Sequence, residues 1–218
     1  PTMAAMMLVA ACPGGALSNV VTYFGRGNLA LSLSISAVSN VLALVFTPLN
    51  FSLMVAANPH TAAWARAIAV DPRELVISLV LLLALPMSAA LLTSRYAPKL
   101  ALRLRRPLSR FAVAAQWKLF LIEITRTLPI VIGHNALGLG LGYGASVLAR
   151  LSVPDRRAVV IEGGMQNSGL ALGIVAAQFN SDLAMVAVAG LWGIWHIVSG
   201  GSLALLWRHL DRRSRQLN

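Results

Sequence analysis

One apolar, membrane-length segment carries a carboxylate among small and amide-bearing residues. Across residues 158–179 the single charge is Glu162, which a Gly-Gly pair and the amides of Gln166 and Asn167 closely follow. A carboxylate near mid-bilayer costs several kcal/mol (~2.5–3.5 for the comparable Asp), so it normally faces a partner, an ion or water. Two adjacent glycines continue a helix poorly and free backbone carbonyls. A broken helix of this kind is typical of a cation site at the membrane midplane.

An alternative interpretation of Glu162 is structural. The carboxylate would then be paired with an Arg or Lys elsewhere in the helix bundle. No basic residue lies near the centre of any other clear apolar span, so the sequence favours the cation site.

A second interrupted segment lies near the start of the sequence. Residues 12–15 read Cys-Pro-Gly-Gly inside an apolar run. Because proline lacks an amide donor and clashes with the preceding turn, Pro13 predicts an opening of the helix. Ser18 and Asn19 follow and supply neutral oxygens beside the freed carbonyls.

Three serines on the next span share one helical face. Ser32, Ser36 and Ser39 stand at i, i+4 and i+7. Hydroxyls in membrane helices often bond only to their own backbone. A stripe that faces a broken helix nevertheless favours cation ligation.

Composition indicates a membrane protein. Hydrophobic residues make up 57% of the chain and the mean hydropathy is +0.73, well above the ~45–50% apolar content of soluble domains. The net charge of +11 is gathered in short clusters beside the spans, which is the positive-inside pattern and argues against nucleic-acid binding. The single cysteine, Cys12, excludes an intrachain disulfide and any multi-cysteine metal site.

The hydropathy pattern predicts an all-α polytopic fold. The expected spans are 3–24, 29–49, 74–95, 128–149, 158–180 and 183–207. The loops 25–28 and 150–157, the cluster 95–110 and the basic tail belong inside, and the loop 50–73 outside. Residues 111–127 must then also cross, yet a helix there would reach ~26 Å against a ~30 Å core. A strained short span and a truncated helix both remain open.

Two further patterns concern packing and symmetry. Glycines at 138, 140, 142 and 144 let helix backbones approach closely in lipid. The two interrupted segments share an order of Gly-Gly, then amides or hydroxyls, then a polar turn and an apolar span. Interrupted helices at corresponding positions indicate an inverted-repeat transporter.

These motifs together resemble the bile acid:sodium symporter family. Residues 12–15 with 18–23, followed by 27–32, look like its fourth and fifth helices. Residues 162–169, Glu-Gly-Gly-Met-Gln-Asn-Ser-Gly, are similar to its ninth-helix motif, and Trp195-His196 followed by Ser199-Gly200 to its tenth. The likeness runs nearly end to end.

The resemblance implies ten helices in two inverted repeats, with the fourth and ninth broken and crossing. This chain would hold six to seven spans in one transmembrane domain, with 1–49 ending the first repeat and 74–218 forming the second, shortened near 111–127. Sodium (Na+) would be the coupling ion. One sodium site would take Ser18, Asn19, Ser32, Ser36 and Glu162; a second would take Glu162, Gly163, Met165 and Gln166. Asn167 and His196 would face the organic-anion cavity.

The sequence also departs from the family pattern. Gly163 replaces a usual valine, and Ile197 stands where the family often has asparagine, which affects bile-acid specificity. The first three helices and most of the seventh are expected to be missing.

The expected function is sodium-coupled symport of an organic anion, bile-acid-like or a small carboxylate, by alternating access. The expected location is the bacterial inner membrane, with a cytoplasmic C-terminus. The alternatives are an incomplete or non-transporting membrane component and arsenite-type efflux using Cys12. An enzyme is disfavoured because His60 and His134 have no carboxylate or cysteine at ligand spacing.

Overall fold

The computed structural model describes residues 1–68 and 127–217, with single positions at 73, 77, 81 and 96. Every named element in these ranges is an α-helix. The helices are α1 (Thr2–Ala11), α2 (Ala16–Phe24), α3 (Leu29–Ala57), α4 (Pro59–Ile68), Thr127–Leu148, α7 (Val153–Gly164), α8 (Ser168–Gln178) and α9 (Leu183–Leu217). Apart from a few single positions, the expected span 74–95 and the segment 111–127 lie outside the described residues.

Three of these helices are long and apolar enough to cross a membrane. They are Leu29–Ala57, Thr127–Leu148 and Leu183–Ser214. The apolar helices α1 and α8 are shorter, as expected for halves of interrupted spans. The described fold is therefore all-helical and polytopic.

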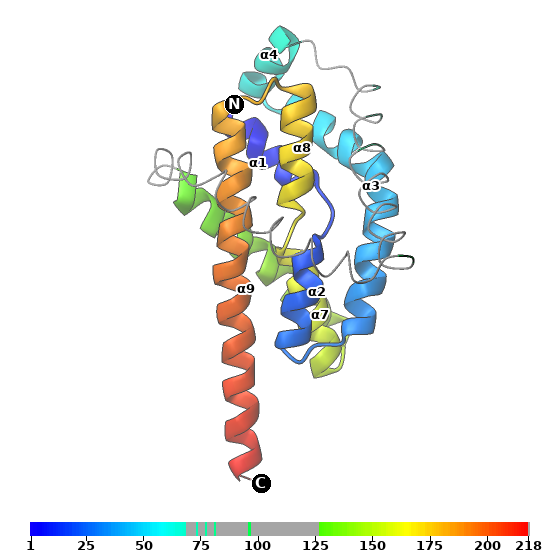
Figure 1. The fold of residues 1–218 in the computed structure, drawn as a ribbon, viewed down its shortest axis with the longest axis vertical. Coiled ribbons are helices and arrows are strands. Elements are labelled where there is room, and N and C mark those ends of the chain that lie inside the picture. Colours follow the sequence, from blue (N-terminus) through cyan, green and yellow to red (C-terminus); the bar gives the residue numbers. More distant parts are fainter. Residues whose placement is uncertain (69–72, 74–76, 78–80, 82–95, 97–126, 218) are drawn as a thin grey trace.

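Helix α9 runs along the long axis of the described fold, and its C-terminal turns extend beyond the other helices (Figure 1). Helices α1 and α8 pack along its N-terminal half, and α2 packs lower down. Helix α3 covers the opposite side of α1 and α2. The main core lies between α1, α8 and the upper part of α9, and Trp192 is its largest fully buried side chain.

Helix α3 continues past the expected end of its span. The predicted span beginning at residue 29 is present, but its end at 49 and the loop predicted from residue 50 are wrong, because α3 runs to Ala57 with Pro48 inside it and α4 follows. The buried positions Ala43, Thr47, Phe51 and Val55 are spaced four apart. This face packs against the core, and proline inside a membrane helix is tolerated where neighbouring groups satisfy the freed backbone.

Helix α9 also extends beyond its expected end at 207. The turn that follows residue 207 is held in place by Asp211. Both of its carboxylate oxygens accept hydrogen bonds from the buried guanidinium of Arg157, at 2.6 and 3.0 Å. The same guanidinium lies over the ring of Trp207. These contacts give the polar end of α9 a fixed place in the fold.

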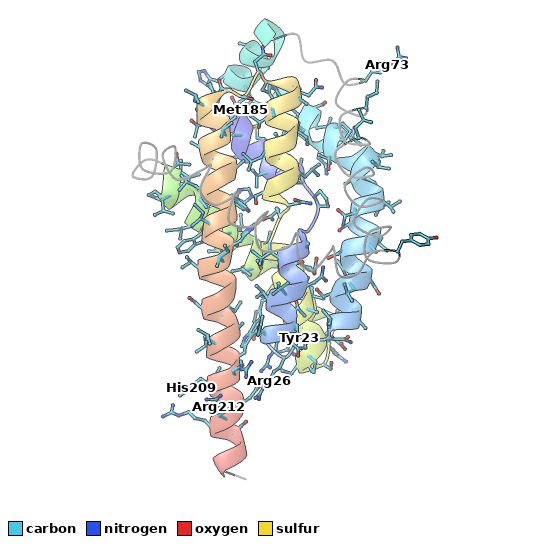
Figure 2. The ribbon with its side chains drawn as sticks, viewed as in Figure 1. Tyr23, Arg26, Arg73, Met185, His209 and Arg212 are labelled. Atoms are coloured by element: carbon cyan, nitrogen blue, oxygen red, sulfur yellow. The ribbon has the colours of Figure 1, made fainter. Side chains whose placement is uncertain are left out.

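Three basic segments meet at this end of the molecule. Asn28 of the 25–28 loop donates its backbone amide to the Pro154 carbonyl at 2.9 Å, and Arg26 lies 3.5 Å from Asp211. Figure 2 shows Arg26, His209 and Arg212 at the same end. The two loops and the tail that the charge pattern assigns to one side of the membrane are thus neighbours.

The Thr127–Leu148 helix packs on α7 through two of its five glycines. A Cβ at Gly138 would lie 2.8 Å from the Gly163 carbonyl, and one at Gly142 would lie 2.9 Å from the Val159 carbonyl. Gly140 and Gly144 have no such neighbour within 4 Å among the described residues. The expected packing role therefore holds for Gly138 and Gly142, which lie on the face turned to α7.

Candidate functional site

Both interrupted spans open where the sequence indicates, and the two openings lie together. Helix α1 ends at Ala11 and α2 begins at Ala16; α7 ends at Gly164 and α8 begins at Ser168. The two extended stretches run antiparallel, with Gly14 opposite Gln166. Their backbones pair directly.

This pairing satisfies polar groups that the broken helices leave open. The Gly15 amide donates to the Met165 carbonyl at 3.2 Å, and the Asn167 amide donates to the Pro13 carbonyl at 2.7 Å. In hydrocarbon each unsatisfied backbone group costs several kcal/mol. We call residues 12–15 and 165–167 the crossover.

The carboxylate of Glu162 lies beside the crossover and accepts hydrogen bonds from three serines. The hydroxyl of Ser18 on α2 is 2.6 Å from Oε1, and that of Ser32 on α3 is 2.5 Å away. Ser36 donates at 3.0 to 3.1 Å. Glu162 is 9% exposed, and among the described residues no basic side chain forms an ion pair with it. In the described part of the chain, the partners of the Glu162 carboxylate are therefore hydroxyl groups and not an Arg or Lys.

Asn19 completes the first predicted ligand set. Its Nδ2 donates to the Ser36 hydroxyl at 3.2 Å, and its Oδ1 lies 2.9 Å from the Ser32 hydroxyl. The structure thus brings Ser18, Asn19, Ser32, Ser36 and Glu162 into one connected cluster. Ser39, the third member of the stripe, instead donates to the Ser36 carbonyl in its own helix.

The cluster holds more oxygens at bonding distance than it has hydroxyl protons. Ser32 lies within reach of oxygens of Glu162, Asn19 and Thr22, at 2.5, 2.9 and 3.3 Å, and one hydroxyl donates to one acceptor at a time. Ser18 likewise lies 2.6 Å from both the Gly15 carbonyl and Glu162. Such an oxygen-rich set with one negative charge suits a hard cation.

Gly14 is the residue that allows Glu162 to reach the crossover. A Cβ on Gly14 would lie 2.5 Å from Oε2 of Glu162. Any other side chain would therefore displace the carboxylate. At the second glycine of the pair, Gly15, an added Cβ would lie 3.2 Å from the Cα of Asn167.

The second predicted ligand set is less convergent. Gln166 Nε2 donates to the Gly163 carbonyl at 3.3 Å, while its buried Oε1 has no partner among the described residues. The Met165 carbonyl accepts from Gly15 in the crossover. These groups are local to one stretch of chain, and their role as ligands stays a prediction.

The two residues predicted to bind the organic anion have structural partners here. Asn167 caps α8, because its Oδ1 accepts from the Leu170 amide at 3.0 Å. His196 is 2% exposed and its ring packs edge-on against Trp192. Their contact with a substrate stays a prediction.

The structure adds residues that sequence reasoning missed. Thr22 is fully buried beside Ser32, and its spacing of four from Ser18 was the available signal. Asn135 is 1% exposed and donates to the Gly164 carbonyl at 2.7 Å. An amide side chain inside an apolar helix is a signal that the sequence offers, but the sequence does not reveal that its partner is the Gly164 carbonyl.

Comparison with known proteins gives this geometry a context. Residues 1–131, more than half of the chain, match the model described as the Sodium Bile acid symporter family. The uncharacterized sodium-dependent transporter YocS of Bacillus subtilis is 32% identical over 213 residues, which cover 93% of this chain and 63% of YocS.

Other relatives show the same partial coverage. A probable chloroplastic sodium/metabolite cotransporter of rice is 32% identical over 219 residues, covering 95% of this chain and 51% of that protein. The sodium-dependent organic anion transporter of the rat is 24% identical over 230 residues, covering 97% and 59%. This chain therefore spans about half to two-thirds of the length of these relatives. It is an integral membrane protein, and it belongs to the sodium bile acid symporter family.

Proposed function

We propose that the chain takes part in sodium-coupled symport of an organic anion by alternating access. The observation that carries this proposal is Glu162, a buried carboxylate bonded to three serine hydroxyls from two other helices. Sodium at this point would add positive charge to a cluster rich in oxygens. It would also lower the cost of keeping the carboxylate in a low-dielectric setting.

Sodium would bind where the two interrupted spans meet. Ser18 and Asn19 belong to the first span, Glu162 to the second, and Ser32 and Ser36 to α3. A cation held by all three therefore draws the halves of the broken helices together. In the proposed cycle this organises the crossover and the nearby residues Asn167 and His196, which contact the anion.

The fold fits an inverted-repeat arrangement. Each interrupted span is followed by a long apolar helix, α3 after α2 and α9 after α8. We assign residues 1–49 to the end of the first repeat and 74–218 to the second, within one transmembrane domain. The basic end formed by the 25–28 loop, the 150–157 loop and the tail is assigned to the cytoplasm, in a bacterial inner membrane.

The names of the relatives support the proposed substrate class. Their names include a sodium/metabolite cotransporter and a sodium-dependent organic anion transporter. We propose an organic anion, either bile-acid-like or a small carboxylate, as the species carried with sodium.

The experiment measures thermal unfolding of the purified protein in detergent, in sodium against choline at matched ionic strength. Sodium at ~100 times its dissociation constant would stabilise the fold by ~2.7 kcal/mol. Glu162→Gln keeps the shape of the side chain and removes its charge, so the sodium-specific stabilisation should disappear. Equal stability of the unaltered protein in both salts would contradict the proposal.

A second candidate is an incomplete or non-transporting membrane component. It is favoured by the coverage of 51% to 63% of the first two relatives described above. Reconstituted vesicles distinguish the two candidates. Sodium-dependent stabilisation without uptake of any tested anion under a sodium gradient would favour the component.

A further inference from the structure

Asn135, on the Thr127–Leu148 helix, joins the last residue of α7 to α9 through both ends of its amide. Its Nδ2 donates to the carbonyl of Gly164 at 2.7 Å, and its Oδ1 accepts from the indole Nε1 of Trp195 at 3.0 Å. The side chain is 1% exposed. A buried amide with partners on both sides is held in one orientation.

The Gly164 carbonyl is a group that needs such a donor. Gly164 ends α7, and an unbroken helix would bring the Ser168 amide to its oxygen. The Ser168 amide instead donates to the Gln166 carbonyl at 3.0 Å.

The other interrupted span has a comparable arrangement. The hydroxyl of Thr47 on α3 donates to the carbonyl of Ala11, the last residue of α1, at 2.7 Å. The amide that would serve this carbonyl in an unbroken helix, that of Gly15, donates to Met165 instead. At each break a side chain from an intact helix thus replaces the lost backbone donor. Asn135 differs from Thr47 because a third helix, α9, holds it in turn.

The position of Gly164 gives this contact a consequence for the cation cluster. Glu162 precedes it by two residues in the last turn of α7, so the orientation of that turn directs the carboxylate. Trp195 is the neighbour of His196 on α9. The chain of contacts from Gly164 through Asn135 to Trp195 therefore connects the cation cluster with the part of α9 expected to meet the anion.

We propose that Asn135 is a positioning residue for cation binding, which fixes the last turn of α7 and transmits its state to α9 through Trp195. The proposal rests on the proposed function, because it assumes that sodium binds at Glu162. Asn135 touches neither the carboxylate nor the hydroxyl cluster in the described contacts. Its effect on the cation is therefore indirect.

The test is a sodium titration of thermal stability for variants of the full chain. Partners that orient metal ligands typically change affinity by about 10- to 100-fold when removed. Asn135→Ala should raise the sodium concentration for half-maximal stabilisation about tenfold or more. A purely structural role would lower the melting temperature in choline and leave this midpoint unchanged.

Trp195→Phe is the milder second variant. It removes the indole donor and leaves the bond from Asn135 to Gly164 in place, so the sodium midpoint should rise by less than in Asn135→Ala. If the two side chains act in one chain of contacts, the double variant should bind sodium no more weakly than Asn135→Ala alone. Independent, multiplicative effects would overturn the transmission through Trp195.

Ser146→Ala is the matched control on the same helix. Ser146 is fully buried and donates to the Tyr143 carbonyl of its own helix, so its sodium midpoint should match that of the unaltered protein. An unchanged midpoint in Asn135→Ala overturns the positioning role while the cation site stands. Loss of the sodium effect in the unaltered protein itself removes both proposals.

Discussion

The hydroxyl of Ser32 lies 2.5 Å from Oε1 of Glu162, although the two residues are 130 positions apart in the chain. This contact joins α3 to α7 across the crossover. Because Ser18 approaches the same oxygen from α2 at 2.6 Å, three helices are fixed by one carboxylate.

Ser32→Ala should weaken sodium binding. The substitution removes one oxygen from the cation cluster and one of the three hydroxyl donors to Glu162. We expect the sodium midpoint in thermal unfolding to rise about tenfold, which corresponds to ~1.4 kcal/mol. Ser34→Ala, two residues away, removes an exposed hydroxyl that bonds to the Ala30 carbonyl of its own helix and should leave the midpoint unchanged. Equal midpoints for both variants would exclude Ser32 from the site.

Gly14→Ala should abolish the sodium effect. A methyl group at this position would lie 2.5 Å from Oε2 of Glu162, so either the carboxylate or the crossover must move. Overpacking of this kind typically costs ~1–3 kcal/mol. Gly133→Ala is the control, because an added Cβ there meets nothing within 4 Å among the described residues. Retained sodium stabilisation in Gly14→Ala would contradict the prediction, because it would mean that the structure accommodates the methyl group without losing the cation site.

Gly138→Ala should destabilise the protein more than Gly140→Ala. The methyl group at Gly138 would meet the Gly163 carbonyl at 2.8 Å, whereas the same group at Gly140 has open space among the described residues. Alanine favours a helix over glycine by ~1 kcal/mol, so Gly140→Ala should be neutral or stabilising. Chemical or thermal unfolding in choline separates the two variants, and equal stabilities would argue against close packing of Thr127–Leu148 on α7.

Acid should remove a stabilising contribution of Asp155, which lies in the exposed first turn of α7. Hydrogen bonds from Ser152 and Asn28 lower the pKa of Asp155 below its ordinary 3.8. A carboxyl group with a lowered pKa in the folded state stabilises the fold above its unfolded pKa and loses this effect as the pH falls through the folded value. The stability advantage over Asp155→Asn should therefore be present at pH 7 and shrink below about pH 4. A difference that is constant with pH would contradict this role.

The sequence predicts the two breaks well because their cause is local. Pro13 lacks an amide donor, and the glycine pairs at 14–15 and 163–164 weaken the helix at the same points where it opens. The serine stripe on α3 likewise placed Ser32 and Ser36 on one face. Local chemistry and helical spacing were sufficient for these features.

Other features depend on contacts that spacing does not reveal. The hydropathy pattern misplaced the end of α3, which continues past Pro48 and packs Phe51 and Val55 into the core. Ser39 shares the stripe but donates to the Ser36 carbonyl of its own helix, which the helical spacing does not predict. The partner of Asn135 is the Gly164 carbonyl, which lacks a helical donor because α7 ends there. Spacing alone does not predict this contact, because it depends on where the helix breaks.

The pairing of the two openings has a consequence for the synthesis of the protein. Ser18 and Glu162 are 144 positions apart, so the first opening is made long before the second emerges from the ribosome. Until then the backbone around Pro13 has no antiparallel partner, and lipid offers none. We expect the nascent first segment to wait at the insertion machinery or in a water-filled space, and to settle into the bilayer when the later segment arrives.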